Sequence, residues 1–215
     1  SKHFLTKKLF ALLLLALGSS LLALTFSRSV WIAIAIFLLI LIYRSKFFNP
    51  KKTAIIFFTT IAAIGLTLFP LRELFTSRIT TPTTTTEEFS LTGRVWLTEQ
   101  AITVIKEHPF LGVGAGSFII QLADRAGEFN FVEPVHNIPL LVTSELGILG
   151  LILILAIMFS IGKNFFQTKN PNAIIIGALL IGLGAISLFD HYLWTLASGR
   201  LILGFVLGLW EGQIA

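Results

Sequence analysis

Three side chains in this sequence are suited to bind a phosphate or to accept a proton from a hydroxyl group. Arg28 and Arg94 carry planar guanidinium groups, whose fixed donors fit phosphate oxygens. Arg94 also opens an expected helix, where backbone N–H groups favour anions. His136 precedes Asn137 and the start of a hydrophobic stretch, and its near-neutral pKa makes it the best general-base candidate. Together they indicate a diphosphate site with a proton acceptor.

Each of these residues also has a plainer interpretation. Arg28 lies between two hydrophobic stretches and can extend its charge to lipid headgroups. Arg94 taken alone is most simply a solvated charge at a helix end. A single histidine before a helix is more often a structural, hydrogen-bonded residue, and this applies to His136. His108 and His191 are weaker candidates for a proton acceptor.

Several acidic and basic groups near the hydrophobic stretches need a partner, because a buried charge is costly. Glu145 is expected to be buried and to pair with an arginine of the site or with a polar group of the bundle. Asp190 is expected to pair with His191 or Arg200 as a structural lock. No histidine, cysteine and carboxylate cluster with metal-ligand spacing is visible, so the sequence predicts no tightly held metal and no cofactor.

The glycines at 112, 114 and 116 alternate in a way that resembles a nucleotide-binding loop. The segment lacks the lysine and the serine or threonine of a P-loop, and no strand precedes it. A tight loop packed at the membrane surface is the better interpretation.

Composition places these residues in a membrane protein. The 215 residues are 55% hydrophobic and only 13% charged, against about a quarter charged in a soluble domain. The absence of cysteine excludes disulfides and iron–sulfur clusters. The basic residues flank apolar stretches, which argues against nucleic acid as a partner. Five stretches meet or approach the roughly 20 residues of a spanning helix: Leu9–Phe26, Thr53–Phe69, Ile138–Ile161, Ala173–Leu188 and Tyr192–Trp210. A sixth, Val30–Tyr43, is short and can either cross a thinned bilayer or pack against neighbouring helices.

The charges of the connecting segments predict their side of the membrane, since short cytoplasmic loops collect Lys and Arg. The charged residues of three segments are all basic: the segment before residue 9, the segment 43–53 and the segment 162–172. The long segment 71–135 has more acidic than basic residues and is therefore expected outside. These assignments agree only if all six stretches cross. The expected fold is an all-α, polytopic bundle with transmembrane helices in 1–70, an extracytoplasmic loop in 71–137 and further transmembrane helices in 138–215.

The extracytoplasmic loop is expected to contain a threonine-rich connector, 80–86, and a surface helix from Gly93 to Glu107. Ser90 or Thr92 is a suitable cap for this helix, and Pro109 ends it. Its expected apolar stripe contains Val95, Ile102 and Ile105.

Four segments in one order resemble the O-antigen ligase and O-antigen polymerase superfamily of bacterial membrane glycosyltransferases. The resemblance covers nearly the whole chain and corresponds to the C-terminal half of a typical member, which predicts that this sequence is part of a longer protein. The segments are Thr-Phe-Ser-Arg-Ser (25–29), Gly93-Arg94 with Trp96, the run from His108 to Phe118, and Val135-His-Asn followed by Ser144-Glu-Leu-Gly-Ile-Leu-Gly150.

The resemblance implies a membrane-embedded, GT-C-like glycosyltransferase fold in a bacterial cytoplasmic membrane. It implies transfer of a glycan from an undecaprenyl-diphosphate carrier to a hydroxyl of an acceptor glycan, lipid or protein, without a metal. Arg28 and Arg94 would hold the diphosphate and His136 would take the acceptor proton. Asn137 and Glu145 complete the expected substrate-binding set.

Two other classes of function fit the same composition. A transporter or flippase of lipid-linked glycans also needs arginines on the outer face, but the paired halves with interrupted helices typical of many transporters are not visible. A noncatalytic membrane scaffold would require the three site residues to be dispensable.

Overall fold

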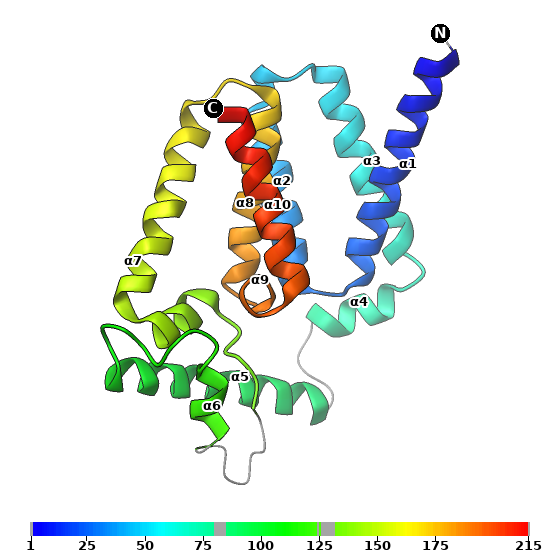
Figure 1. Cartoon of the computed structure of the whole chain (residues 1–215). Coiled ribbons are helices and arrows are strands. Elements are labelled where there is room, and N and C mark those ends of the chain that lie inside the picture. Colours follow the sequence, from blue (N-terminus) through cyan, green and yellow to red (C-terminus); the bar gives the residue numbers. More distant parts are fainter. Residues whose placement is uncertain (1, 80–84, 124, 126–131, 215) are drawn as a thin grey trace. The chain divides into compact units, whose positions relative to one another are not determined.

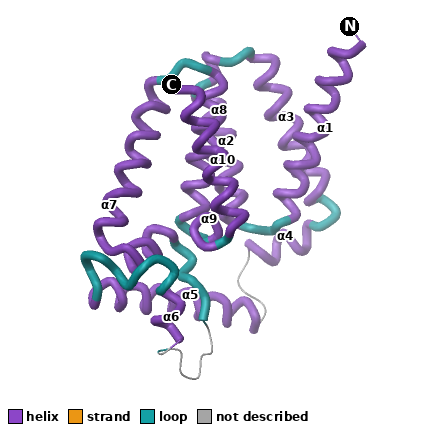
Figure 2. Tube along the Cα trace, in the orientation of Figure 1, coloured by secondary structure: helices purple, strands orange, loops and turns teal. Residues whose placement is uncertain are grey.

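The computed structural model describes residues 2–79, 85–123, 125 and 132–214, and every regular element in these ranges is helical (Figures 1 and 2). The chain divides into two compact units, Ser1–Thr83 and Thr84–Ala215. The predicted all-α class is therefore confirmed. The predicted threonine-rich connector lies mostly outside the described residues, and its last two residues belong to a helix of the second unit.

The first unit contains four α-helices and one turn of 3-10 helix: α1 (Lys2–Leu24), α2 (Arg28–Tyr43), η1 (Ser45–Phe47), α3 (Pro50–Leu68) and α4 (Arg72–Ile79). α1 and α3 pack against each other, and the Thr67 hydroxyl donates to Ser20 Oγ across their contact at 2.9 Å. Asn49 begins α3 by accepting hydrogen bonds from the N–H groups of Lys51 and Lys52, with Pro50 in the first turn.

The second unit contains α5 (Thr85–Glu107), α6 (Phe118–Ala123), α7 (Ile138–Gln167), α8 (Pro171–Ser187), α9 (Tyr192–Thr195) and α10 (Ala197–Ile214). α8 and α10 pack together, and α5 lies against the first turns of α7 (Figure 1). The core of the α5 contact is a set of fully buried apolar side chains from four segments: Leu97, Ala101, Val104, Phe118, Leu122, Val135 and Leu141.

The apolar stripe predicted for α5 lies on the exposed side of the helix, and a different apolar side packs against the core. Val95 is 59% exposed and Ile102 is 40% exposed, whereas Leu97, Ala101 and Val104 are completely buried. Apolar residues occupy opposite sides of this helix, so the sequence alone does not show which side packs against the core. The helix also begins eight positions before the predicted Gly93.

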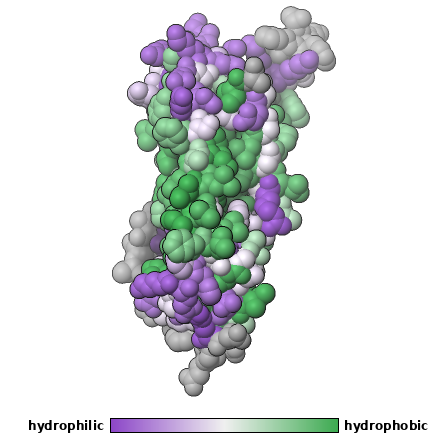
Figure 3. Space-filling view, turned by 60° about the vertical axis from the view of Figure 1, so that its left-hand side comes forward, coloured by the Kyte–Doolittle hydropathy of each residue, from purple (hydrophilic) through white to green (hydrophobic). Residues whose placement is uncertain are grey.

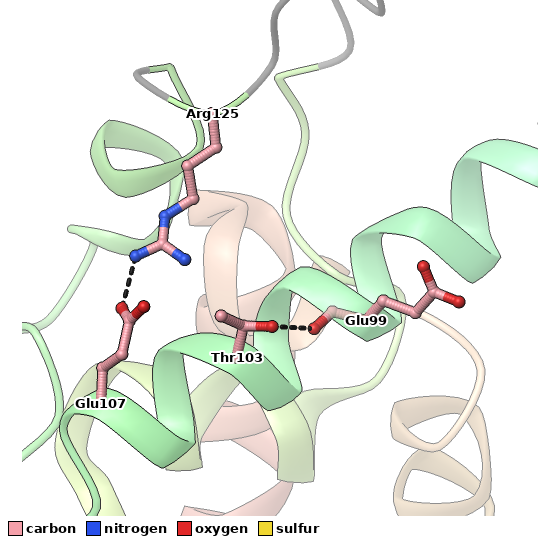
Figure 4. Close-up of polar contacts among 4 residues, drawn as sticks. All are labelled: Glu99, Thr103, Glu107 and Arg125. Carbon is pink, nitrogen blue, oxygen red and sulfur yellow. Dashed lines mark hydrogen bonds and ion pairs between the residues drawn. The ribbon is translucent and has the colours of Figure 1, made fainter.

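The end of α5 is held by a charged contact that Figure 4 shows in detail. Arg125, just after α6, donates a hydrogen bond to the carboxylate of Glu107 in the last turn of α5. This bond lowers the pKa of the Glu107 carboxyl group. One turn earlier, the Thr103 hydroxyl donates to the backbone carbonyl of Glu99 at 2.9 Å. α6 is thereby tied to α5 at both the apolar core and the surface.

Three described helices are long and apolar enough to cross a membrane: Thr6–Leu24, Pro50–Leu68 and Ile138–Gln167. α2 and α8 are apolar but shorter, and the predicted stretch Tyr192–Trp210 is divided between α9 and α10, with extended backbone at Leu196. Figure 3 shows a broad area of hydrophobic side chains on the visible face. The protein is thus a helical membrane protein, and the count of six crossings stays a prediction.

Candidate active site

Two histidines from distant parts of the sequence meet in the second unit. His136 lies just before α7, and His191 lies just before α9. Their ring centroids are 4.9 Å apart, with the rings at 83°. Asp190 Oδ1 accepts a hydrogen bond from the backbone N–H of His191 at 2.8 Å, and Nδ1 of His191 lies 2.7 Å from Thr195 Oγ1. The structure therefore gives His136 a neighbour that the sequence analysis ranked only as a weaker candidate.

The surroundings of both imidazoles favour the neutral form. Burial lowers the pKa of His136, and the positive charge of Arg94 lowers it further, against weaker opposing effects from Asp190 and Glu133. Burial is also the largest effect on the pKa of His191, which is lowered. A neutral imidazole can accept a proton, so the site suits general-base chemistry at neutral pH.

Asn137 has two structural hydrogen bonds at the start of α7. Its side-chain oxygen accepts from the N–H of Leu140 at 2.9 Å, and its side-chain nitrogen donates to the carbonyl of Leu188 at 3.0 Å. The first bond caps α7 and the second connects α7 to the end of α8. Asn137 thus fixes the backbone beside His136, and its predicted contact with substrate stays a prediction.

Glu145 is buried, with 2% of its surface exposed. Its carboxylate accepts a hydrogen bond from the Trp194 indole N–H at 2.9 Å, so its partner is a polar group of the bundle and not an arginine. Trp194 belongs to α9, the single turn that follows His191. Glu145 therefore supports the turn that carries the second histidine, and its predicted contact with substrate also stays a prediction.

Arg200 supports the same turn from the other side. One of its guanidinium nitrogens donates to the backbone carbonyls of Trp194 and Thr195, at 3.0 and 2.9 Å. Of the two partners predicted for Asp190, His191 is the one that it binds, through the backbone N–H, whereas Arg200 binds these carbonyls. α9 is a single turn, so its last backbone carbonyls have no hydrogen-bond donor within the helix. The guanidinium of Arg200 supplies that donor.

The glycine-rich segment packs its backbone into a break in α7. Gly147 has φ 67° and ψ −168°, which interrupts the helix. The N–H groups of Val113 and Gly114 donate to the carbonyls of Ser144 and Glu145 at 3.0 and 2.8 Å. The N–H of Ile148, beyond the break, donates to the Pro109 carbonyl at 2.9 Å. We call residues 109–114 the clasp; it supplies the hydrogen bonds that the broken helix lacks.

The clasp depends on glycine at the points of closest approach. A Cβ on Gly112 would lie 2.3 Å from the carbonyl carbon of Glu145. A Cβ on Gly147 would lie 2.1 Å from the backbone oxygen of Phe110. Both residues also have positive φ, which side chains disfavour. These glycines serve close packing of backbone on backbone, in agreement with a tight loop and not with a nucleotide loop.

Arg94 lies in the third turn of α5 and is exposed, so the expectation that it uses free N–H groups at a helix N-terminus was wrong. Arg28 has that position instead, because it is the first residue of α2. Ser27 precedes it without a side-chain hydrogen bond that caps the helix, and Phe26 has a positive φ of 49°. Arg28 belongs to the first unit, whereas Arg94 and His136 belong to the second.

The pattern that characterises O-antigen ligases matches residues 11–155, more than half of the chain. The chain belongs to the O-antigen ligase family. No curated protein and no solved structure matches it. This family member is therefore a membrane enzyme of the ligase or glycosyltransferase type in polysaccharide biosynthesis, and its partners are a lipid-linked glycan and an acceptor.

The family match includes Arg28, Arg94, His136 and Glu145 but ends before His191. In the structure, Asp190 and His191 lie beside His136, the candidate residue of this O-antigen ligase family member. One possible ligand atom from each of His136, Asp190 and His191 lies within 4.8 Å of the others. The sequence analysis found no such cluster because it depends on the fold and not on local spacing.

Proposed function

We propose that this protein transfers a glycan from an undecaprenyl-diphosphate carrier to an acceptor hydroxyl at the outer face of a bacterial cytoplasmic membrane. The observation that carries the proposal is the position of His136, partly buried beside His191 and subject to the charge of Arg94. The family indicates the class of reaction. The surroundings of His136 support its proposed role as a proton acceptor near the positive charge of Arg94. The segment 71–137 would then lie outside the cytoplasm.

In the proposed reaction, the acceptor oxygen attacks the anomeric carbon while the bond from that carbon to the diphosphate oxygen breaks. The acceptor proton passes to an imidazole nitrogen of His136, and the electron pair of the broken bond leaves with the diphosphate. Because the departing diphosphate is already a good leaving group, the enzyme mainly positions the acceptor and stabilises negative charge. Removal of the proton by His136 would contribute about 10²–10⁴-fold in rate. No step requires a metal.

The two arginines are proposed to bind the diphosphate. The exposed guanidinium of Arg94 acts electrostatically on both histidines, so an anion held there would lie near the proton acceptor. In the first unit, Arg28 is the first residue of α2, so its cationic side chain lies at the helix end where the first N–H groups are free. Both features favour the binding of an anion. These features support the predicted binding roles of Arg28 and Arg94.

The decisive experiment reconstitutes the full-length protein in lipid vesicles with a lipid-diphosphate-linked glycan and an acceptor. His136→Ala should lower the rate of transfer by about 10²–10⁴-fold, and Arg28→Ala or Arg94→Ala should abolish detectable transfer. Arg125→Ala is the matched control, because Arg125 is a loop arginine that pairs with Glu107. Wild-type transfer by the first three variants would refute the proposed roles. Movement of the carrier across the bilayer without transfer would instead indicate a transporter.

A further inference from the structure

We propose that His136, Asp190 and His191 bind a divalent transition-metal ion, with zinc as the best fit, and that this ion inhibits the enzyme. The three side chains each offer one ligand atom, and these atoms lie within 4.8 Å of one another. Two imidazoles and one carboxylate are typical zinc ligands and leave a fourth position open. The inhibition rests on the proposed role of His136 as proton acceptor, whereas the binding site does not.

The hydrogen bonds of His191 leave one ring nitrogen ready to bind a metal. Thr195 Oγ1 lies 3.2 Å from the His191 carbonyl and 2.7 Å from Nδ1 of the same residue. When the hydroxyl proton points to the carbonyl, the Thr195 oxygen accepts a hydrogen bond from Nδ1–H, and this tautomer of His191 is the one that can bind a metal through its other nitrogen. In that tautomer the lone pair of His191 is on Nε2. A metal-bound histidine commonly donates its other N–H to a second group in this way.

His136 contributes a second observation that indicates a missing partner. Its Nδ1 atom is buried and forms no hydrogen bond within the described part of the chain. A buried polar atom without a partner calls for an explanation, and a bound ion is one of the few available. Burial also lowers the pKa of His136, so the ring is neutral at pH 7 and needs to lose no proton before it binds a metal.

The charges around the cluster set a moderate expected affinity. Asp190 brings one negative charge, and Glu133 is close enough to raise the pKa of both histidines, so both groups favour a cation. The positive charge of Arg94 lowers the pKa of both histidines and therefore opposes the binding of a cation. Ligand atoms of a tetrahedral zinc ion lie roughly 3.4 Å apart, so the side chains must move together on binding. Micromolar affinity is therefore expected, and the site would fill reversibly.

The test uses the full-length protein in lipid nanodiscs, purified without a histidine tag and titrated with Zn²⁺ against a coloured chelator. One ion should bind per chain. His136→Ala, Asp190→Asn and His191→Ala should each weaken binding by about 100-fold or more, since loss of even a second-shell partner costs 10–100-fold. His108→Ala is the matched control, because His108 is exposed and lies outside the cluster. Cobalt(II) bound to the unaltered protein should give the visible absorption of a tetrahedral site, which tests the ligands without any substitution.

The outcomes separate this inference from the proposed function. Zinc affinity unchanged in all three cluster variants, or no binding to the unaltered protein, would overturn the site and leave glycan transfer by His136 untouched. Arg94→Gln should keep zinc binding while it loses transfer, because Arg94 repels the ion but is proposed to bind the diphosphate. Zinc bound at the cluster with full transfer would establish the site and contradict the role of His136 as proton acceptor. Inhibition that follows occupancy of the site supports both.

Discussion

Replacement of Gly147 by alanine should destabilise the second unit more than any other single methyl addition at a glycine discussed here. Gly147 has φ 67° and ψ −168°, a region that is almost exclusive to glycine. A Cβ there would lie 2.1 Å from the Phe110 oxygen and 2.5 Å from the Leu111 nitrogen. Both obstacles are backbone atoms, so no side-chain rotation relieves the clash.

The size of the effect can be estimated from backbone strain and from lost hydrogen bonds. An alanine held at the backbone angles of residue 147 is strained by about 1–3 kcal/mol. If the clasp is displaced, the three backbone hydrogen bonds that join it to α7 are lost. Each contributes about 0.5–1.5 kcal/mol. The total is about 2.5–7.5 kcal/mol, a large part of the stability of an ordinary domain.

Two control variants separate strain from collision. Gly116→Ala has a positive φ of 74° and no atom within 4 Å of the added Cβ, so it should cost only about 1–2 kcal/mol. Gly162→Ala lies in a helix with open space around it and should be neutral or stabilising by up to about 1 kcal/mol. Thermal unfolding of the full-length variants in detergent measures the order of their stabilities. If Gly147→Ala is as stable as Gly116→Ala, the clasp does not hold α7 as described.

Two further predictions concern the histidines and their support. Glu145→Gln keeps an oxygen that accepts from the Trp194 indole and should be tolerated, whereas Glu145→Ala leaves that N–H unpaired and should cost about 1–3 kcal/mol in thermal stability; equal stability of the two variants would argue against this support. Because burial lowers the pKa of His136 below its ordinary value of 6.5, and because only the neutral ring accepts a proton, kcat/KM for transfer should fall at low pH with a midpoint below pH 6.5. A midpoint above pH 6.5 in a pH–rate profile would contradict this assignment.

The sequence predicted the helical class and the start of α7 because these depend on local chemistry. The sequence indicates a helix start at Ile138, and α7 begins there, since Asn137 accepts from Leu140 N–H and Pro139 fits the first turn. The same logic of an asparagine cap and a following proline begins α3 and α8. Such signals lie within three or four residues and do not depend on tertiary contacts.

The packed face of α5 and the break in α7 depend instead on long-range contacts. Leu97 and Val95 are both apolar, and only the fold decides that Leu97 meets Phe118 while Val95 is exposed. Across Gly147 the hydrophobic run continues without interruption, so hydropathy predicts one continuous helix. The break becomes visible only when the clasp is seen to donate to the carbonyls of Ser144 and Glu145.

The candidate site was predicted in part for the same reason. His136 could be singled out because it precedes Asn137 and a hydrophobic stretch and because an imidazole has a pKa near neutrality. His191 was ranked lower because nothing in the sequence brings it to His136. Its position depends on α9, a turn held by Glu145 through Trp194 and by Arg200 through two carbonyls. Interactions of this kind leave no local pattern.

These contacts give the glycine-rich segment a role in the site without contact with substrate. In an apolar environment the free carbonyls and N–H groups of a broken helix are costly, so the clasp must satisfy them. By holding the backbone of Glu145, the clasp fixes the start of a series of contacts that continues through Trp194 and α9 to His191 and then to His136. A methyl group added at Gly112 collides with the backbone of Glu145 and changes no charge. Its effect would therefore reach His136, the proposed proton acceptor, entirely through geometry.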